Sequence, residues 1–385
     1  MVIFKQTTVK KKEKHRRTYR CSWKLEVSND KYKSRGIRDI YLSVILPIRN
    51  GEPWIDTCLE SIEKQTALKT MKLEISVCDD SSNDKTLEIL KSWRGKLKSL
   101  SISLRIHRNE GPDPRGVGYA KNRAVENSTG EFLCFQDVDD IMLPCRIQAQ
   151  YDVAKDEKNA IVGGKFRRSP ENATPRFTNW ANAISGDKLE EQIYTSHGPT
   201  IIMPTWFCHK SVFQKVGGFS EAGSGCPEDL VFFYSHLDLG GRILKVDFPV
   251  LIYAYHPQAT TFSISENTIW DLRIARLQDR VLPLWSKLTI WNAGKQGRKL
   301  FRSLSQENKN KVVAFCDVDR RKIGQNYVSY EPMLKKTERP IPIIHFTEAC
   351  PPFIICVKLD MTNGEFEGNL QSLALTEGRD FVHFH

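Results

Sequence analysis

The stretch Glu131-Phe132-Leu133-Cys134-Phe135-Gln136-Asp137-Val138-Asp139-Asp140 is the most informative part of this chain. Four of its first five residues are apolar or aromatic and predict a buried strand, after which three carboxylates fall within four positions. Carboxylates this close raise one another's pKa values, and a divalent cation, which prefers oxygen ligands, would remove the conflict. The stretch therefore predicts either a metal site at a strand end or an ordinary strand followed by an acidic turn.

Predicted strands and helices alternate along the chain up to this stretch. Strands are predicted at Tyr41–Leu46, where Pro47 ends the run, at Leu73–Cys78 and at Ser101–Ile106, and helices after Pro53, around Leu87–Trp93 and at Gly116–Asn127. Such alternation is typical of an α/β fold with a mostly parallel central sheet and helices on both faces. Ligands of these sheets bind beyond the carboxyl ends of the strands, so Asp79-Asp80 and Asp137–Asp140 should meet in one crevice.

Two further groups of polar residues lie in the middle of the chain. Glu228 and Asp229 open an apolar helix over 230–237, where acidic residues also serve simply to complement the helix dipole. A strand predicted at Ile243–Tyr255 leads to His256. A lone histidine in such a place is more often a structural residue than a metal ligand.

The character of the sequence changes after a long helix predicted at Thr268–Leu284. A strand at Lys287–Trp291, a glycine-containing turn, a helix and a strand ending in Asp317-Val318-Asp319 resemble the start of a Rossmann-like unit. The turn Asn292–Gly297 lacks the first of the three glycines of the dinucleotide fingerprint, so NAD(P) chemistry and a supporting structural role both stay open. We expect a smaller Rossmann-like α/β domain at 286–385.

Charge divides the chain into three parts. Its 385 residues carry a formal net charge of +11, with 13 basic and 4 acidic residues in 1–40, 29 and 31 in 41–285, and 15 and 11 in 286–385. The basic peak at Lys10–Arg17 suits a nuclear-localisation signal, a nucleic-acid-binding arm or a solvated, disordered tail. Because no apolar run is long enough to span a bilayer and no signal peptide is recognisable, we expect no membrane association, reduced cysteines and a cytoplasmic or nuclear protein.

Six short motifs occur in order within residues 41–285. They are Ser43-Val44-Ile45-Leu46-Pro47, Val77-Cys78-Asp79-Asp80-Ser81-Ser82, Ala120-Lys121-Asn122, Asp137-Val138-Asp139-Asp140, Val216-Gly217-Gly218-Phe219 and Pro227-Glu228-Asp229-Leu230. Each motif is weak alone, but six in this order are specific, and the segment resembles a family 2 glycosyltransferase with the GT-A fold. One departure is Lys121, where that family usually has arginine. The positive charge is kept, but a guanidinium group that can donate two parallel hydrogen bonds is lost.

The resemblance implies a UDP-sugar donor and a bound Mn²⁺ or Mg²⁺. The residues implied on the nucleotide-sugar side are Pro47, Asp79, Asp80, Lys121, Asn122, Asp137 and Asp140. Among them, Asp79 or Asp80 would accept hydrogen bonds from the uracil ring. Asp137 or Asp140 would complete the metal site or hold the ribose.

The resemblance also implies which residues act on the metal and on the acceptor. Asp139 would bind the metal, and His256 would contact the metal or a phosphate. Asp229 would be the general base that takes the proton of the acceptor hydroxyl, with Glu228 beside it. The family inverts the anomeric centre in one in-line displacement, so no nucleophilic side chain is expected.

The C-terminal part of the sequence narrows the resemblance. The stretches Trp291–Lys299 and Ala314–Asp319 are similar to those that accompany the GT-A domain in a tRNA-modifying galactosyltransferase. This implies transfer of galactose from UDP-galactose to the queuosine base of tRNA-Tyr, and basic flanks suit such a polyanionic acceptor. The alternatives are a UDP-GlcNAc-dependent N-acetylglucosaminyltransferase acting on a glycan or protein, and a binding module without activity. Neither the sugar nor the oligomeric state follows from the sequence.

Overall fold

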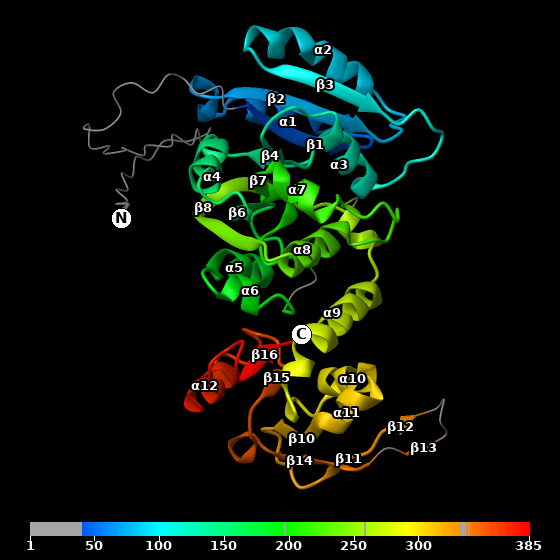
Figure 1. Ribbon diagram of the computed structural model, residues 1–385, viewed down its shortest axis with the longest axis vertical. Helices are drawn as coiled ribbons and strands as arrows, with labels where there is room; N and C mark the ends of the chain where they lie inside the picture. The colour runs from blue at the N-terminus through cyan, green and yellow to red at the C-terminus, as the bar shows by residue number, and fades with distance from the viewer. Residues whose placement is uncertain (1–40, 196–197, 258, 332–335, 338) are drawn as a thin grey trace, which may run out of the picture. The chain divides into compact units, whose positions relative to one another are not determined.

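The structure is a computed structural model that describes residues 41–385 except 196–197, 258, 332–335 and 338. The predicted tail 1–40, and with it every interpretation of Lys10–Arg17, lies outside the described residues. Figure 1 shows two main β-sheets, one built from strands between residues 41 and 254 and one from strands between 288 and 383.

The first sheet has eight strands in the order β3-β2-β1-β4-β7-β6-β8-β5. The strands are β1 (Tyr41–Ile48), β2 (Lys72–Asp79), β3 (Ser103–Arg108), β4 (Phe132–Phe135), β5 (Ile141–Met142), β6 (Ala160–Ser169), β7 (Phe207–His209) and β8 (Arg242–Ala254). Four of its seven pairings are parallel, and the antiparallel ones join β4 to β7, β6 to β7 and β5 to β8. The prediction of an α/β fold with a mostly parallel sheet is confirmed.

Helices cover both faces of this sheet because β1 is apolar on both sides. Its even-numbered residues from Leu42 to Leu46 pack with α1 (Ile55–Glu63) and α2 (Thr86–Ser99), whereas Ile45 packs with α3 (Val117–Glu126). Successive side chains of a strand point to opposite faces, so a strand apolar on both faces needs cover on each. The remaining helices up to residue 284 are α4 (Arg146–Ala154), α5 (Pro175–Ala183), α6 (Lys188–Glu191), α7 (Lys210–Val216), α8 (Glu228–Asp238) and α9 (Glu266–Arg280), with short 3₁₀ turns η1 (Thr66–Lys69), η2 (Met203–Thr205), η3 (Thr260–Ser263) and η4 (Leu282–Leu284).

Strand β1 continues through Pro47 to Ile48, beyond its predicted end. The carbonyl of Ile45 accepts a hydrogen bond from the N–H of Gln136, which follows the end of β4 at Phe135. Backbone groups two residues apart point the same way, so the nitrogen of Pro47 faces the side where β4 has already ended. The N–H that proline lacks therefore leaves no ladder bond unmade.

Two predicted elements end earlier than expected. Helix α9 ends at Arg280 rather than at Leu284, because Pro283 cannot continue an α-helix and the chain makes a 3₁₀ turn instead. The strand predicted from Phe353 to Leu359 ends at Ile355.

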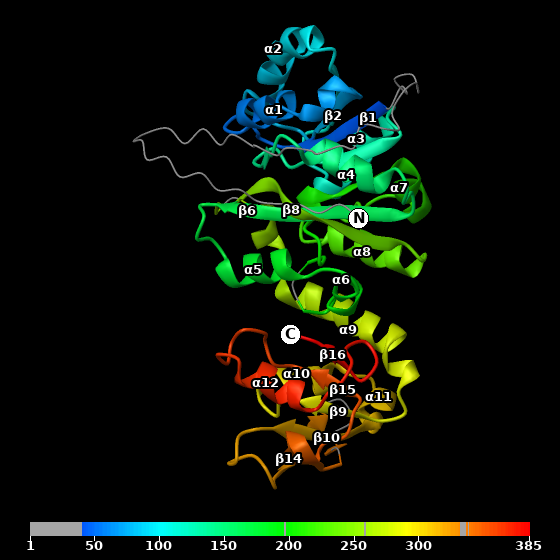
Figure 2. The ribbon, with the colours of Figure 1, turned by 90° about the vertical axis from the view of Figure 1, so that its left-hand side faces the viewer.

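The second sheet has the order β11-β14-β10-β9-β15-β16. Its elements are β9 (Leu288–Trp291), α10 (Lys295–Ser303), α11 (Gln306–Lys311), β10 (Val312–Asp317), β11 (Asn326–Tyr327), β14 (Ile341–His345), η5 (Phe346–Glu348), β15 (Phe353–Ile355), α12 (Glu365–Ser372) and β16 (Phe381–His383), and β12 (Tyr330–Glu331) pairs separately with β13 (Lys336–Thr337). Figure 2 shows helices α10 to α12 beside these strands. Counted along the chain, the five parallel strands lie in the order 3-2-1-4-5, the doubly wound order of Rossmann-like sheets.

The turn after β9 is occupied by the chain's own side chains. Asp317 Oδ2 accepts a hydrogen bond from Ala293 N at 2.9 Å, and Asn292 Oδ1 accepts one from Gly294 N at 2.7 Å. A dinucleotide would need backbone N–H groups of such a turn for its pyrophosphate. The structure therefore gives the NAD(P) alternative no support.

Two expectations about composition bear on the described residues. No helix in this part of the chain combines the length and apolar character that crossing a bilayer requires. The nine cysteines in the same residues are free thiols, and six of them are buried.

Candidate active site

The two carboxylates at the carboxyl end of β2 differ in how their oxygens are used. Asp80 accepts hydrogen bonds from the backbone N–H of Arg115 at 3.0 Å and of Gly116 at 2.8 Å, and so holds the turn that precedes α3. Asp79 Oδ2 is buried, lies 3.6 Å from Arg108 Nε and has no hydrogen-bond partner among the described residues. Of the two carboxylates left open by the sequence, Asp79 therefore has the spare acceptor oxygen.

The acidic turn after β4 brings three carboxylates together. One oxygen from each of Asp137, Asp139 and Asp140 lies within 4.8 Å of the others. Burial raises the pKa of Asp137 to about 6, and burial together with the charge of Asp139 raises the pKa of Asp140 well above its usual range. Asp140 Oδ1 accepts from Ala254 N at 2.8 Å, while its buried Oδ2 has no hydrogen-bond partner in the described chain. Hard oxygen donors with an unused lone pair fit Mn²⁺ or Mg²⁺.

A buried arginine holds the backbone of this turn through hydrogen bonds. Arg146 is fully buried and donates to Gln136 Oε1 at 2.8 Å and to the carbonyl of Phe135 at 2.6 Å. Gln136 Nε2 in turn donates to the carbonyls of Asp137 at 2.8 Å and Asp140 at 2.9 Å. The network fixes the acidic turn and places a positive charge behind it. The sequence did not identify Arg146, because it lies on a helix ten residues along the chain from Gln136.

His256 reaches the same acidic turn from the end of β8. Its Nε2 lies 2.7 Å from Asp139 Oδ2, and its ring stacks on Trp54 with centroids 5.0 Å apart. Trp54 precedes α1 and was not among the site residues predicted from the sequence. The structure thus brings His256 beside Asp139, the residue predicted to bind the metal.

The adjacent carboxylates that open α8 have different surroundings. Glu228 Oε1 lies 2.7 Å from Lys121 Nζ, and the two side chains are only 8% and 3% exposed. Asp229 accepts from Leu230 N at 2.7 Å, and burial followed by the charge of Glu228 raises its pKa to about 7. Lys121 is therefore committed to Glu228, and Asp229 is left close to the pKa that suits a general base at neutral pH.

Two residues predicted on the nucleotide-sugar side are already engaged in the fold. Asn122 accepts from Phe219 N at 2.8 Å and donates to Phe219 O and Glu221 Oε1, both at 2.9 Å. These bonds hold the turn at Gly218, whose backbone is left-handed with φ 95°. A nucleotide contact from Asn122 would require one of these bonds to open. Pro47 is buried within β1.

A cavity of about 640 Å³ adjoins Asp229. Aromatic rings and a cation from several elements contribute to its lining, among them Arg168, Phe177, Trp180 and Tyr253. The guanidinium of Arg168 lies 4.0 Å from the centroid of the Tyr253 ring. None of these four residues was predicted to be a site residue, because none belongs to one of the six sequence motifs.

A sheet of this order, with an acidic turn after β4 and paired carboxylates at the start of α8, defines the class of GT-A folds. Residues 43–217 match the model of glycosyl transferase family 2.

Curated relatives match parts of the chain. The uncharacterized glycosyltransferase EpsJ of Bacillus subtilis is 24% identical over 57% of this chain and 62% of its own length. The poly(ribitol-phosphate) beta-N-acetylglucosaminyltransferase TarS of Staphylococcus aureus is 41% identical over 26% of this chain and 16% of its own length. The chain thus spans less than two thirds of either relative.

Solved structures of glycosyltransferases are also similar. The structure of S. aureus TarS 1-349 with UDP-GlcNAc has a TM-score of 0.48 and 18% identity, covering 69% of this chain and 71% of that one. The mannosyltransferase PcManGT of Pyrobaculum calidifontis, in complex with GDP-Man and Mn²⁺, has a TM-score of 0.45 and 18% identity over 61% of each chain.

Proposed function

We propose that this chain is an inverting glycosyltransferase that moves a sugar from a UDP-sugar to a hydroxyl group of its acceptor. The observation that carries the proposal is the position of Asp229, which lines a cavity and has a pKa raised to about 7. The family match of residues 43–217 supports it.

On the donor side, Asp79 would accept a hydrogen bond from the uracil ring with its spare Oδ2. Asp139, Asp140 and His256 would hold Mn²⁺ or Mg²⁺, with Asp137 completing the site or holding the ribose. The bound metal would act as a Lewis acid that offsets the charge developing on the UDP leaving group.

On the acceptor side, Asp229 would take the proton of the attacking hydroxyl group. The acceptor oxygen forms its bond to the anomeric carbon while the bond from that carbon to the UDP oxygen breaks, so the configuration inverts. Lys121 would fix Glu228 and so limit the negative charge around the base. This assigns Glu228 a positioning role beside Asp229 rather than the role of base.

For the particular reaction, we propose galactose transfer from UDP-galactose to queuosine in tRNA-Tyr. The support is the resemblance of Trp291–Lys299 and Ala314–Asp319 to a tRNA-modifying galactosyltransferase, together with the basic flanks. Two curated relatives are named for poly(ribitol-phosphate), which is also a phosphate polymer.

The second candidate is N-acetylglucosamine transfer to a glycan or protein. The name of TarS, an N-acetylglucosaminyltransferase, favours this donor. The two candidates separate in one experiment, in which purified protein is incubated with Mn²⁺, UDP-galactose or UDP-GlcNAc, and queuosine-containing tRNA-Tyr. Mass analysis of the nucleosides should show an added hexose on queuosine. An added N-acetylhexosamine would show that the donor is UDP-GlcNAc rather than UDP-galactose. Unmodified tRNA with both donors would show that queuosine-containing tRNA-Tyr is not the acceptor.

A further inference from the structure

The cavity beside Asp229 has a wall that comes from the second sheet. Lys358, Leu359 and Asp360, which follow β15, line it together with His385, which follows β16. Of the described residues predicted to contact the nucleotide or the metal, none lines this cavity. The donor and metal residues therefore lie outside a space that the candidate base shares with the second sheet.

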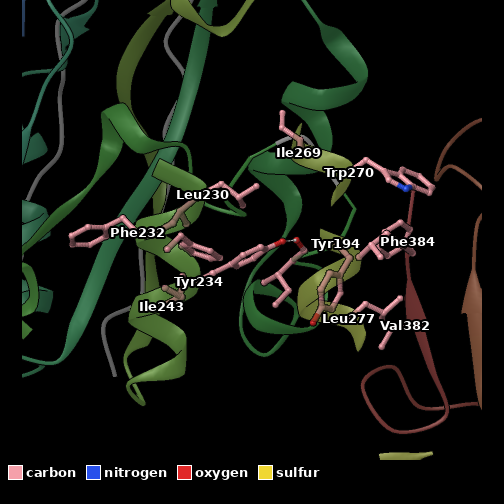
Figure 3. Packing of buried hydrophobic residues seen from close by; sticks show 14 of the residues in the cluster. Tyr194, Leu230, Phe232, Tyr234, Ile243, Ile269, Trp270, Leu277, Val382 and Phe384 are labelled. Atoms are coloured by element: carbon pink, nitrogen blue, oxygen red, sulfur yellow. Dashed lines mark hydrogen bonds between the residues drawn. The ribbon is translucent and has the colours of Figure 1, made fainter. Parts of the chain in front are cut away.

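The chain segment that forms this wall packs against residues that precede the second sheet in the chain. Phe384 is fully buried, stacks on Tyr194 with ring centroids 6.1 Å apart and meets Trp270 edge-on at 5.1 Å (Figure 3). The guanidinium of Arg273 lies 4.5 Å from the Phe384 ring. His385 N also donates to the carbonyl of Tyr194 at 3.2 Å.

A second anchor is polar. Glu377 Oε2 accepts from Lys188 Nζ at 2.7 Å and from Gln192 Nε2 at 3.1 Å, and the Glu377 side chain is only 4% exposed. A buried carboxylate paired in this way is costly to separate from its partners. The two anchors keep the residues that follow β15 and β16 beside the cavity.

The lining suits a ring that carries hydroxyl groups. Phe177, Trp180 and Tyr253 supply flat apolar faces on which a ring can stack. Arg168 Nε is buried without a hydrogen-bond partner in the described residues, although the guanidinium borders the cavity. Lys358 and Asp360, on the segment that follows β15, add an exposed cation and an exposed anion to the lining. A volume of about 640 Å³ is that of a small-molecule site, large enough to hold such a group.

We propose that the second sheet completes the acceptor site, with Lys358 and Asp360 as specificity-determining residues for a hydroxyl-bearing ring. This inference rests on the proposed glycosyl transfer, since an acceptor must reach Asp229. It also gives the Rossmann-like part of the chain a role that needs no dinucleotide. The part of the chain after the predicted domain boundary near residue 286 would then help to select the acceptor, while the predicted donor and metal residues all lie before that boundary.

The test compares Lys358→Ala and Asp360→Asn with the control Arg320→Ala in the full-length protein. Asparagine tolerates the left-handed backbone of residue 360, where φ is 57°, and Arg320 is exposed, carries the same charge as Lys358 and does not line the cavity. The measurements are KM and kcat for transfer to queuosine-containing tRNA-Tyr or to a glycan acceptor, whichever the wild type uses, together with UDP affinity and hydrolysis of the UDP-sugar without acceptor.

We expect acceptor KM to rise about tenfold in the two cavity variants, as for the loss of one hydrogen bond to a charged group. Turnover, UDP affinity and acceptor-free hydrolysis should match the wild type, and Arg320→Ala should change none of them. Equal acceptor KM in all three variants would overturn this inference alone. A weaker UDP affinity in the cavity variants would assign the wall to the donor and also overturn it. A wild type that neither transfers nor hydrolyses would instead refute the proposed function.

Discussion

The ammonium group of Lys121 lies 2.7 Å from Oε1 of Glu228, whereas Asp229, the next residue along the chain, lines the cavity. Burial alone would lower the pKa of Lys121, but the charges of Glu228, Asp137 and Asp229 together with the hydrogen bond to Glu228 outweigh it, and the pKa is raised. Two adjacent carboxylates are thereby separated in role, one paired inside the protein and one available to an acceptor. This separation leads to the first two predictions.

Asp229→Asn should lose about 10²- to 10⁴-fold in turnover, the usual cost of losing a general base. Its affinity for UDP should be retained, because the base acts on the acceptor. Steady-state kinetics and calorimetric titration with UDP measure the two quantities. If Asp229→Asn keeps the wild-type rate while Glu228→Gln loses it, Glu228 is the base and our assignment is wrong.

The rate should rise with pH through about 7, because Asp229 must be deprotonated to act and its pKa is raised to about that value. Glu228→Gln removes a negative charge that raises this pKa and leaves Lys121 to lower it, so the acidic limb of the pH profile should move to lower pH. Lys121→Met removes the positive charge and should move the limb to higher pH. Profiles of kcat/KM decide the point, and shifts in the same direction for both variants would contradict it.

Asp139→Asn should abolish transfer, and EDTA should silence the wild type until Mn²⁺ or Mg²⁺ is restored. The reason is the cluster of Asp137, Asp139 and Asp140, whose oxygens lie within 4.8 Å of one another. Asp152→Asn, an exposed change on α4, serves as the control and should leave activity intact. Full turnover in EDTA would remove the metal from the mechanism.

Gly118→Ala should destabilise the fold. A Cβ at Gly118 would lie 2.0 Å from the carbonyl oxygen of Ser220, so α3 and the segment before α8 would have to move apart. Overpacking of this kind costs about 1–3 kcal/mol. Gly95→Ala, in α2, adds a Cβ that has no atom within 4 Å apart from its chain neighbours and its own helix backbone, and it should instead stabilise by about 0.5–1 kcal/mol. Urea unfolding measures both changes, and equal midpoints for the two variants would refute the packing argument.

Deletion of residues 1–38 should weaken binding to all tRNAs alike and flatten the dependence of affinity on salt. Residues 1–40 carry 13 basic and 4 acidic side chains, and each phosphate contact adds about 0.7–0.9 to the slope of log affinity against log salt. The choice of nucleoside should stay the same, because phosphate contacts position an RNA and base contacts specify it. An unchanged slope would leave the basic run as a localisation signal only.

Local patterns were enough to predict strands β1 to β4 and β8 of the first sheet, but not β5, β6 or β7. The apolar run at Tyr41–Leu46 and the carboxylates after β2 and β4 place the site at the carboxyl ends of the strands, because parallel strands share that edge. The ends of these elements were predicted less accurately than their positions. Pro47 did not stop β1, because its missing N–H faces the side where β4 has ended.

The periodicity of the elements, the order of the motifs and the acidic turns that follow strands can be read from the chain without a structure. These are properties of neighbouring residues, and backbone geometry converts them directly into structure. The differences between the carboxylates, by contrast, come from tertiary contacts. Asp80 is occupied by the N–H groups of Arg115 and Gly116, and Glu228 is neutralised by a lysine 107 positions earlier. Such pairings, like the wall that Lys358 adds to the cavity beside Asp229, depend on packing between distant elements, for which a linear pattern carries no signal.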